Sequence, residues 1–151
     1  MNINETISFF ENLQLDTENK SERKTHEKFI AILTGLKSKN LTKEQFQKIE
    51  QALNTLTVKV ITENRNKEFK KKLANFTTYL KDEFSFITEG YYTAIGMSLG
   101  MCFGVAFGGV FSKTLGVSMG LTMGMLIGLI AGRIKDSEAE KQGRVLKTKR
   151  D

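Results

Sequence analysis

The residue types that most often carry out chemistry are scarce in this chain and lie far apart. It contains one histidine, His26, and one cysteine, Cys102. A nucleophile and its general base must lie within hydrogen-bonding distance of each other, yet Cys102 falls inside an apolar run and His26 inside a charged segment. One histidine also excludes a multi-histidine metal site within one chain. We therefore predict no catalytic, cofactor-binding or metal-binding residues, and a protein that is not an enzyme.

Simpler structural explanations fit the remaining candidates for chemistry. His26 is expected at a solvated helix position, and Cys102 as a small packing residue, because free cysteine is usually buried. The glycine-rich segment lacks the Gly-Lys-Ser/Thr sequence of a phosphate-binding loop and the strand that precedes one. Four lysines lie between positions 67 and 72, but Glu63 and Glu68 are interleaved with them, which favours a solvated or lipid-facing helix face. We therefore expect no cofactor and no nucleic-acid partner.

The strongest pattern is a glycine at every fourth position in the last third of the chain. Residues four apart lie on one side of a helix, and small residues there let two helix backbones approach closely. Glycine costs up to about 1 kcal/mol per site relative to alanine in a water-exposed helix. In lipid the helix persists, because its backbone must satisfy its own hydrogen bonds. We predict that these glycines pack two membrane helices together: Gly96, Gly100, Gly104, Gly108, Gly116, Gly120, Gly124, Gly128 and Gly132.

The segment that contains these glycines is long enough to cross a membrane twice. From Tyr91 to Gly132 the only residue with a formal charge is Lys113. Two predicted helices, 91–111 and 115–134, each have about 20 residues, which suffices for a hydrocarbon core of about 30 Å. Only Ser112, Lys113 and Thr114 separate them, so the helices must run antiparallel. The sequence therefore predicts a transmembrane hairpin within residues 89–134.

Basic residues flank this hairpin on both sides, whereas its connection contains one lysine. An excess of Lys and Arg marks the cytoplasmic side of a membrane protein. We therefore expect a two-pass protein of the cell (inner) membrane with both termini in the cytoplasm. Tyr91 and Tyr92 fit an interfacial aromatic belt. Each cation near an anionic leaflet contributes about 1 kcal/mol, and the residues expected to contact lipid headgroups, or to enforce this orientation, are Arg133, Lys135, Lys147, Lys149 and Arg150.

A second row of small residues lies two positions from the glycines on each predicted membrane helix. Two positions correspond to about 200° around a helix axis, so this row faces away from the glycines. A helix with small residues on two faces packs closely against two neighbours, which favours a homo-oligomer; the alternative is that this row faces lipid. The predicted oligomer face consists of Ser98, Cys102, Ala106, Ser118 and Thr122.

Residues 1–88 have the apolar spacing of amphipathic helices. The stripes are Ile3, Ile7, Phe10, Leu13; Phe29, Ile30, Ile32, Leu33, Leu36; Phe46, Ile49, Leu53, Leu56, Val60; and Phe69, Leu73, Phe76, Leu80, Phe84, Ile87. A turn is expected at Gly35 and Lys37–Asn40, and Thr42 with Gln45 forms a capping-box pattern that predicts a helix start near Lys43. Residues 55–62 (TLTVKVIT) are mostly β-branched and partly alternate between apolar and polar, which leaves a strand open as the alternative to a helix.

The fold class predicted from these observations is all-α. Three or four amphipathic helices in residues 1–88 form a cytoplasmic region, and because such helices bury a modest core, we expect oligomerisation or coiled-coil association. The transmembrane hairpin follows, and residues 135–151 form a basic cytoplasmic tail. The first hypothesis for function is a membrane-anchored oligomeric scaffold that binds a cytoplasmic protein partner through residues 1–88.

The second hypothesis is a pore-forming or membrane-permeabilising protein assembled through the glycine rows. It is weaker because the predicted spans contain no charge and few polar groups to line a pore. The segments YYTAIGMSLGMCFGVAFGG, GVSMGLTMGMLIGLIAG and KDSEAEKQGRVL resemble small bacterial glycine-zipper membrane proteins over about residues 89–146. The resemblance implies a membrane location and a hairpin shape, but it implies no activity and no site residues.

Overall fold

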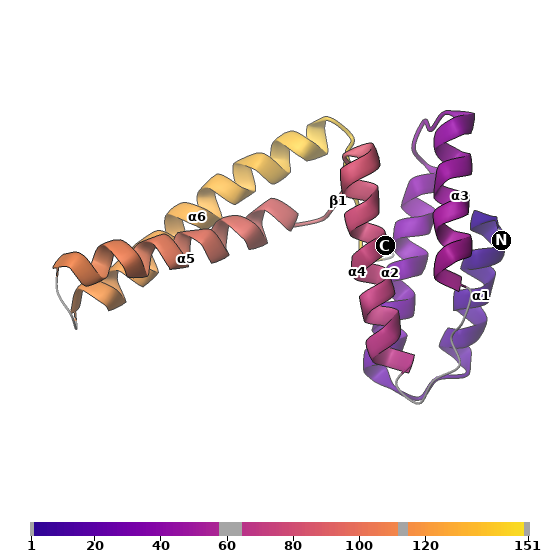
Figure 1. The fold of residues 1–151 in the computed structure, drawn as a ribbon, viewed down its shortest axis with the longest axis horizontal. Helices are drawn as coiled ribbons and strands as arrows, with labels where there is room; N and C mark the ends of the chain where they lie inside the picture. Colours follow the sequence, from indigo (N-terminus) through magenta and orange to yellow (C-terminus); the bar gives the residue numbers. More distant parts are fainter. Residues whose placement is uncertain (1, 58–64, 112–114, 150–151) are drawn as a thin grey trace. The chain divides into compact units, whose positions relative to one another are not determined.

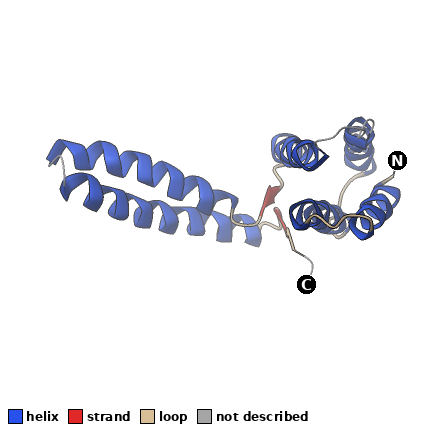
Figure 2. Ribbon diagram, turned by 90° about the horizontal axis from the view of Figure 1, so that it is seen from below, coloured by secondary structure: helices blue, strands red, loops and turns tan. Residues whose placement is uncertain are grey.

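The computed structural model describes residues 2–57, 65–111 and 115–149. Over these ranges the chain forms six helices and two strands of two residues each, as Figures 1 and 2 show. The predicted all-α class is therefore confirmed. The chain divides into two compact units, which we call the helical unit, Met1–Ile87 with Leu146–Asp151, and the hairpin unit, Thr88–Val145.

Four helices make up most of the helical unit: α1 (Ile3–Leu15), α2 (Lys20–Lys37), α3 (Lys43–Thr57) and α4 (Arg65–Phe84). Side chains cap three of their amino ends and so satisfy amide groups that have no partner within the helix. Asn2 and Glu5 form a capping box on α1, and the Asn19 side chain accepts hydrogen bonds from the first turn of α2.

The capping box predicted for α3 is confirmed. Thr42 N–H donates to Gln45 Oε1 at 2.9 Å, Gln45 N–H donates to Thr42 Oγ1 at 3.3 Å, and the helix begins at Lys43. Gly35 lies inside α2, however, and the turn follows Lys37. Of residues 55–62, Thr55–Thr57 belong to α3; the others lie outside the described residues, as does the Ser112–Thr114 connection.

The predicted apolar stripes of the described residues point into the core of the helical unit. Phe10 of α1 stacks on Phe29 of α2 with ring centroids 4.5 Å apart, and Phe69 of α4 meets Phe10 edge-on at 5.8 Å. Ile49 and Leu53 bring α3 into the same buried cluster. The core thus draws on all four helices, and apolar burial of this kind is the main stabilising term in folding.

His26 corrects one prediction, since it lies in this core and not at a solvated position. Its side chain is fully buried, its ring meets Phe69 edge-on at 4.8 Å, and its Nε2 lies 3.9 Å from Glu22 Oε1. The physical reason is helical periodicity. The buried stripe of α2 continues for about two turns before Phe29, and positions 22 and 26 both lie on that extension.

The hairpin unit consists of two long antiparallel helices, α5 (Tyr91–Phe111) and α6 (Leu115–Lys141) (Figure 1). Helix α6 continues past Ile134, where the apolar segment ends, so the first part of the expected tail is helical. It stops where Gly143 adopts φ 69°, and the amide groups of Gly143 and Arg144 donate back to carbonyls of Glu140 and Ala139. This is the usual glycine-terminated end of a helix.

The chain returns to the helical unit after the hairpin. Strand β1 (Ile87–Thr88) pairs with β2 (Val145–Leu146), and Leu146 is buried in the same core cluster as Phe29 and Phe69. A methyl group on Gly35 would lie 3.5 Å from a Leu146 methyl carbon. The hairpin is therefore an insertion in the helical unit, and both of its ends are tied to one folded body.

Candidate functional site

The glycines of α5 lie directly opposite those of α6, in four pairs: Gly96–Gly128, Gly100–Gly124, Gly104–Gly120 and Gly108–Gly116. A Cβ on the first member of any pair would overlap the carbonyl oxygen of the second. A Cβ on Gly104, for example, would also lie 2.8 Å from the carbonyl carbon of Gly120 and 3.2 Å from the Cα of Gly124. The two backbones therefore touch, and only hydrogen fits between them.

Two other glycines mark the limits of this contact. A Cβ on Gly132 would lie 2.5 Å from Thr93 Cα, so the close approach extends to the first turn of α5. A Cβ on Gly109 would meet only Val117 Cγ2, at 3.9 Å. Gly109 thus lies outside the contact, although it neighbours Gly108 in sequence.

An aspartate closes the open end of the hairpin. Tyr92 N–H donates to Asp136 Oδ1 at 2.9 Å, and Thr93 N–H donates to Asp136 Oδ2 at 2.8 Å. The first amides of a helix have no partner within that helix and carry the positive end of its dipole. A carboxylate from α6 therefore caps α5 through two charge-assisted hydrogen bonds. Asp136 thus satisfies two amides that have no partner within α5.

Asp136 was not predicted from the sequence, although the spacing of the glycines indicates its position. The four glycine pairs are symmetric about position 112, so the same register sets position 136 beside position 88, just before the first turn of α5. The signal is the same pairing, extended beyond the last glycine into the charged part of the sequence.

The outer surface of the hairpin is apolar over most of its length. Phe103, Phe107, Val110, Met119 and Ile127 are each more than 60 % exposed. Both helices are long and apolar enough to cross a membrane, with mean hydropathy of 1.6 over the best window of Tyr91–Val110 and of Gly116–Lys141. Continuous apolar surface of this extent is unusual for a protein that stays in water.

The five residues predicted as an oligomer face lie on this outer surface and not between the helices. Ser98, Cys102, Ala106, Ser118 and Thr122 are all exposed. The Ser98 hydroxyl donates to Ala94 O at 2.9 Å, and the Thr122 hydroxyl lies 3.0 Å from Met119 O. Both hydroxyls therefore have a hydrogen-bond acceptor within their own helix.

One face of the hairpin is hollowed into a groove of about 820 Å³. The paired glycines form its floor. Its walls are the side chains one position before them, Leu99, Phe103 and Phe107 on α5 and Met119, Met123, Ile127 and Ala131 on α6. Thr122, which also lines the groove, is the one lining residue with a polar side chain. The groove therefore suits an apolar occupant.

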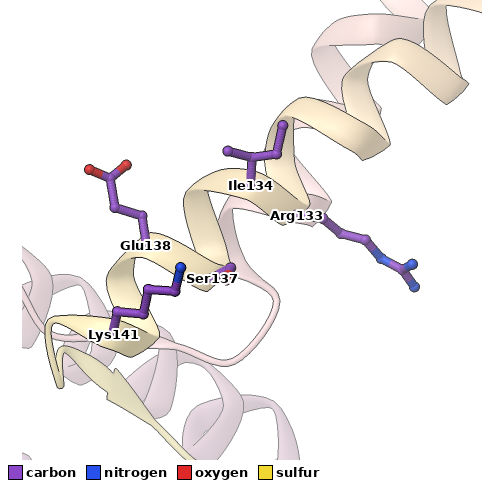
Figure 3. Close-up of a pocket in the computed structure, with 5 residues that line it drawn as sticks. All are labelled: Arg133, Ile134, Ser137, Glu138 and Lys141. Atoms are coloured by element: carbon purple, nitrogen blue, oxygen red, sulfur yellow. The ribbon is translucent and has the colours of Figure 1, made fainter.

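The predicted headgroup contacts divide between the two units. Arg133 and Lys135 are exposed on α6, just past its apolar part; Lys147 and Lys149 are exposed beyond β2, and Arg150 is outside the described residues. A shallow hollow of about 460 Å³ on α6 is lined by Arg133, Ile134, Ser137, Glu138 and Lys141. Figure 3 shows Arg133 projecting away from Glu138, so these side chains do not converge on one point.

Among the residues that the structure describes, no three His, Cys, Asp or Glu side chains group as a metal site would require. The most distinct feature of the hairpin is its packing: two helix backbones are in contact, the exterior is apolar, and the Asp136 carboxylate caps the open end. Comparison of the chain with protein-family models, with curated proteins and with solved structures finds no match.

Proposed function

We propose that this protein is a non-enzymatic, two-pass membrane scaffold. In this proposal the α5–α6 hairpin is a glycine zipper that anchors the helical unit at the cytoplasmic face of the cell membrane, where that unit binds a protein partner. The observation that carries the proposal is the pairing of backbone-to-backbone glycine contact with an apolar exterior in one hairpin. Such contact favours helix association in lipid, where no hydrophobic effect drives helices together.

The connectivity supports the two-pass orientation. Because the chain leaves the helical unit at Ile87 and rejoins it at Leu146, both hairpin ends must emerge on the side that holds that unit. Arg133, Lys135 and Lys141 follow the apolar part of α6, and basic residues favour the cytoplasmic side. The expected location is thus the inner membrane, with both termini in the cytoplasm.

Accessibility of single cysteines tests this orientation. In a Cys102→Ala background, Lys113→Cys should react with a membrane-impermeant thiol reagent added to intact cells. Lys141→Cys should react only after the cells are lysed. The reverse pattern would refute the cytoplasmic placement of the helical unit. Partners would then be sought by cross-linking the full-length protein in native membranes, with Leu146→Asp as a variant that disrupts the helical unit.

Self-association through the second small-residue row is part of the proposal. The row is exposed in a single chain, so a second copy can reach it. Ser98→Phe with Ala106→Phe should reduce the particle size in mild detergent, whereas Val105→Phe, at an exposed position about 100° around the helix from Ala106, should not. An unchanged size in the double variant would count against this contact.

A pore is the second candidate, because small-residue helices pack closely in assemblies. The hydroxyls of Ser98 and Thr122 already bond to their own backbones, and a pore needs polar groups that remain available to water and ions. A liposome dye-release assay separates the two functions. The scaffold predicts leakage no greater than that of empty vesicles, and robust leakage would favour the pore.

A further inference from the structure

The geometry points to a lipid-binding groove on the hairpin, which takes one acyl chain of an anionic phospholipid from the surrounding bilayer. This inference rests on the proposed membrane insertion and adds a specific site and ligand class to it. The site is the groove floored by the paired glycines and walled by Leu99, Phe103 and Phe107 on α5 and by Met119, Met123 and Ile127 on α6.

The lining chemistry selects hydrocarbon. The floor consists of glycine Cα and backbone atoms already engaged in helical hydrogen bonds, and the walls are aliphatic, aromatic or thioether side chains. The only hydroxyl in the lining, on Thr122, lies 3.2 Å from Ser118 O and 3.0 Å from Met119 O. A polar occupant would find no partner there, whereas a hydrocarbon chain would gain dispersion contacts on three sides.

The length of the groove suits an acyl chain from one leaflet. The lining residues of α5 extend from Gly96 to Gly108 and those of α6 from Gly116 to Ala131, which is about 20 Å at about 1.5 Å per residue. One leaflet supplies half of a hydrocarbon core of about 30 Å, so the groove can hold an acyl chain over the depth of that leaflet.

Charge complementarity supplies the headgroup preference. The α6 wall residues recur every four positions, at 119, 123, 127 and 131, and the next residue in that row is Lys135. Its side chain is 67 % exposed, and its Nζ lies 3.9 Å from Glu138 Oε2, whose side chain is 56 % exposed. An exposed pair of this kind is weak, so the ammonium group remains available to a phosphate. The wall residues of α5 also recur every four positions, and the same spacing toward the amino end of the helix reaches Tyr91. Tyrosine is an aromatic residue suited to the headgroup level.

The absence of tryptophan from the chain makes a quenching experiment direct. Phe103→Trp puts an indole on the groove wall, and Val105→Trp puts one on the same helix about 200° away at nearly the same depth. Each full-length variant is reconstituted in phosphatidylcholine vesicles that contain increasing fractions of phosphatidylglycerol or phosphatidylcholine with brominated acyl chains. Phe107→Trp provides a second groove position if Phe103→Trp disturbs folding.

The expected result is selective quenching in the groove. For the indole at position 103, half-maximal quenching by brominated phosphatidylglycerol should need about one fifth of the fraction that brominated phosphatidylcholine needs. This ratio corresponds to about 1 kcal/mol for one cation. The indole at position 105 should show less preference, and Lys135→Gln should reduce the preference at position 103.

Three results would overturn the inference. Equal quenching at both positions by both lipids would mean that the hairpin is in the bilayer but has no selective groove. Weaker quenching at position 103 than at 105 would mean that a second copy covers the groove. No quenching at either position would mean that the hairpin is not inserted, which would refute the proposed function as well.

Discussion

Alanine substitution of a paired glycine tests the backbone contact most sharply, and Gly104→Ala is the chosen variant. The added Cβ would overlap the Gly120 carbonyl oxygen and lie 2.8 Å from its carbon, whereas 3.4 Å is the lower limit of ordinary contact. Both of these Gly120 atoms belong to the backbone, so the helices themselves must move apart, by at least about 0.6 Å at that carbon. Overpacking of this kind costs about 1–3 kcal/mol.

Gly109→Ala is the matched control, because its Cβ would meet only a valine methyl group at 3.9 Å. Both substitutions gain similar helix propensity, up to about 1 kcal/mol, so the difference between them isolates the contact. We expect Gly104→Ala to be less stable than Gly109→Ala by about 1–3 kcal/mol, and Gly104→Leu to separate the helices.

The assay is SDS-induced opening of the hairpin in detergent micelles, followed by energy transfer between dyes on Glu89→Cys and Glu138→Cys in a Cys102→Ala background. Gly104→Ala should open at a lower SDS fraction than Gly109→Ala. If the two variants open at the same SDS fraction, the backbones do not touch and the account of the hairpin is wrong.

Four further predictions follow from single residues. Asp136→Ala removes two charge-assisted hydrogen bonds and should destabilise the hairpin by about 2–4 kcal/mol in the same SDS assay. His26→Ala leaves a cavity in the core and should lower the free energy of unfolding of the helical unit by about 2–4 kcal/mol in urea titrations. Leu146→Ala should do the same, by about 2–4 kcal/mol. Burial, with a smaller effect of the Glu83 carboxylate, raises the pKa of Tyr79 above its usual 10.0. Because the folded state holds this proton more tightly than the unfolded state, the free energy of unfolding should fall as pH rises past 10. Tyr79→Phe should abolish this fall.

Two of these substitutions have a control on an exposed neighbour, and the other two are compared with wild type. Glu140→Ala should leave hairpin opening unchanged. If Asp136→Ala also leaves it unchanged, the Asp136 cap contributes nothing to the stability of the hairpin. Lys28→Ala should leave the free energy of unfolding in urea unchanged. If His26→Ala also leaves it unchanged, His26 is not buried in the core. If Leu146→Ala unfolds like wild type, the chain does not return to the core. If Tyr79→Phe loses stability above pH 10 as wild type does, another group is responsible.

The helices and their buried faces were predictable because each depends on local spacing. The capping box at Thr42 and Gln45 fixes the start of α3, and the Phe69–Leu80 stripe of α4 points inward as its period predicts. His26 was misjudged by residue type. The stripe of α2 extends to it, but a lone polar residue suggested solvent, and burial beside Glu22 depends on α1 and α4, which the local sequence does not reveal.

The features that the sequence analysis missed join residues far apart along the chain. Asp136 caps α5 across 44 positions, and Leu146 packs against Gly35 across the whole hairpin. Composition suggested that residues 135–151 form a basic tail, because most of them are polar and carry no long apolar stripe. The extension of α6 to Lys141 and the burial of Leu146 in the core of the helical unit depend on tertiary contacts that composition does not reveal.

Extraction of native membranes at alkaline pH tests the central claim most directly. Membranes from cells that express the full-length chain are washed with sodium carbonate and then centrifuged at high speed. If α5 and α6 span the bilayer, the protein stays in the pellet and enters solution only with detergent. Release into the carbonate supernatant, together with a monomeric particle that needs no detergent, would contradict membrane insertion and every proposal built on it.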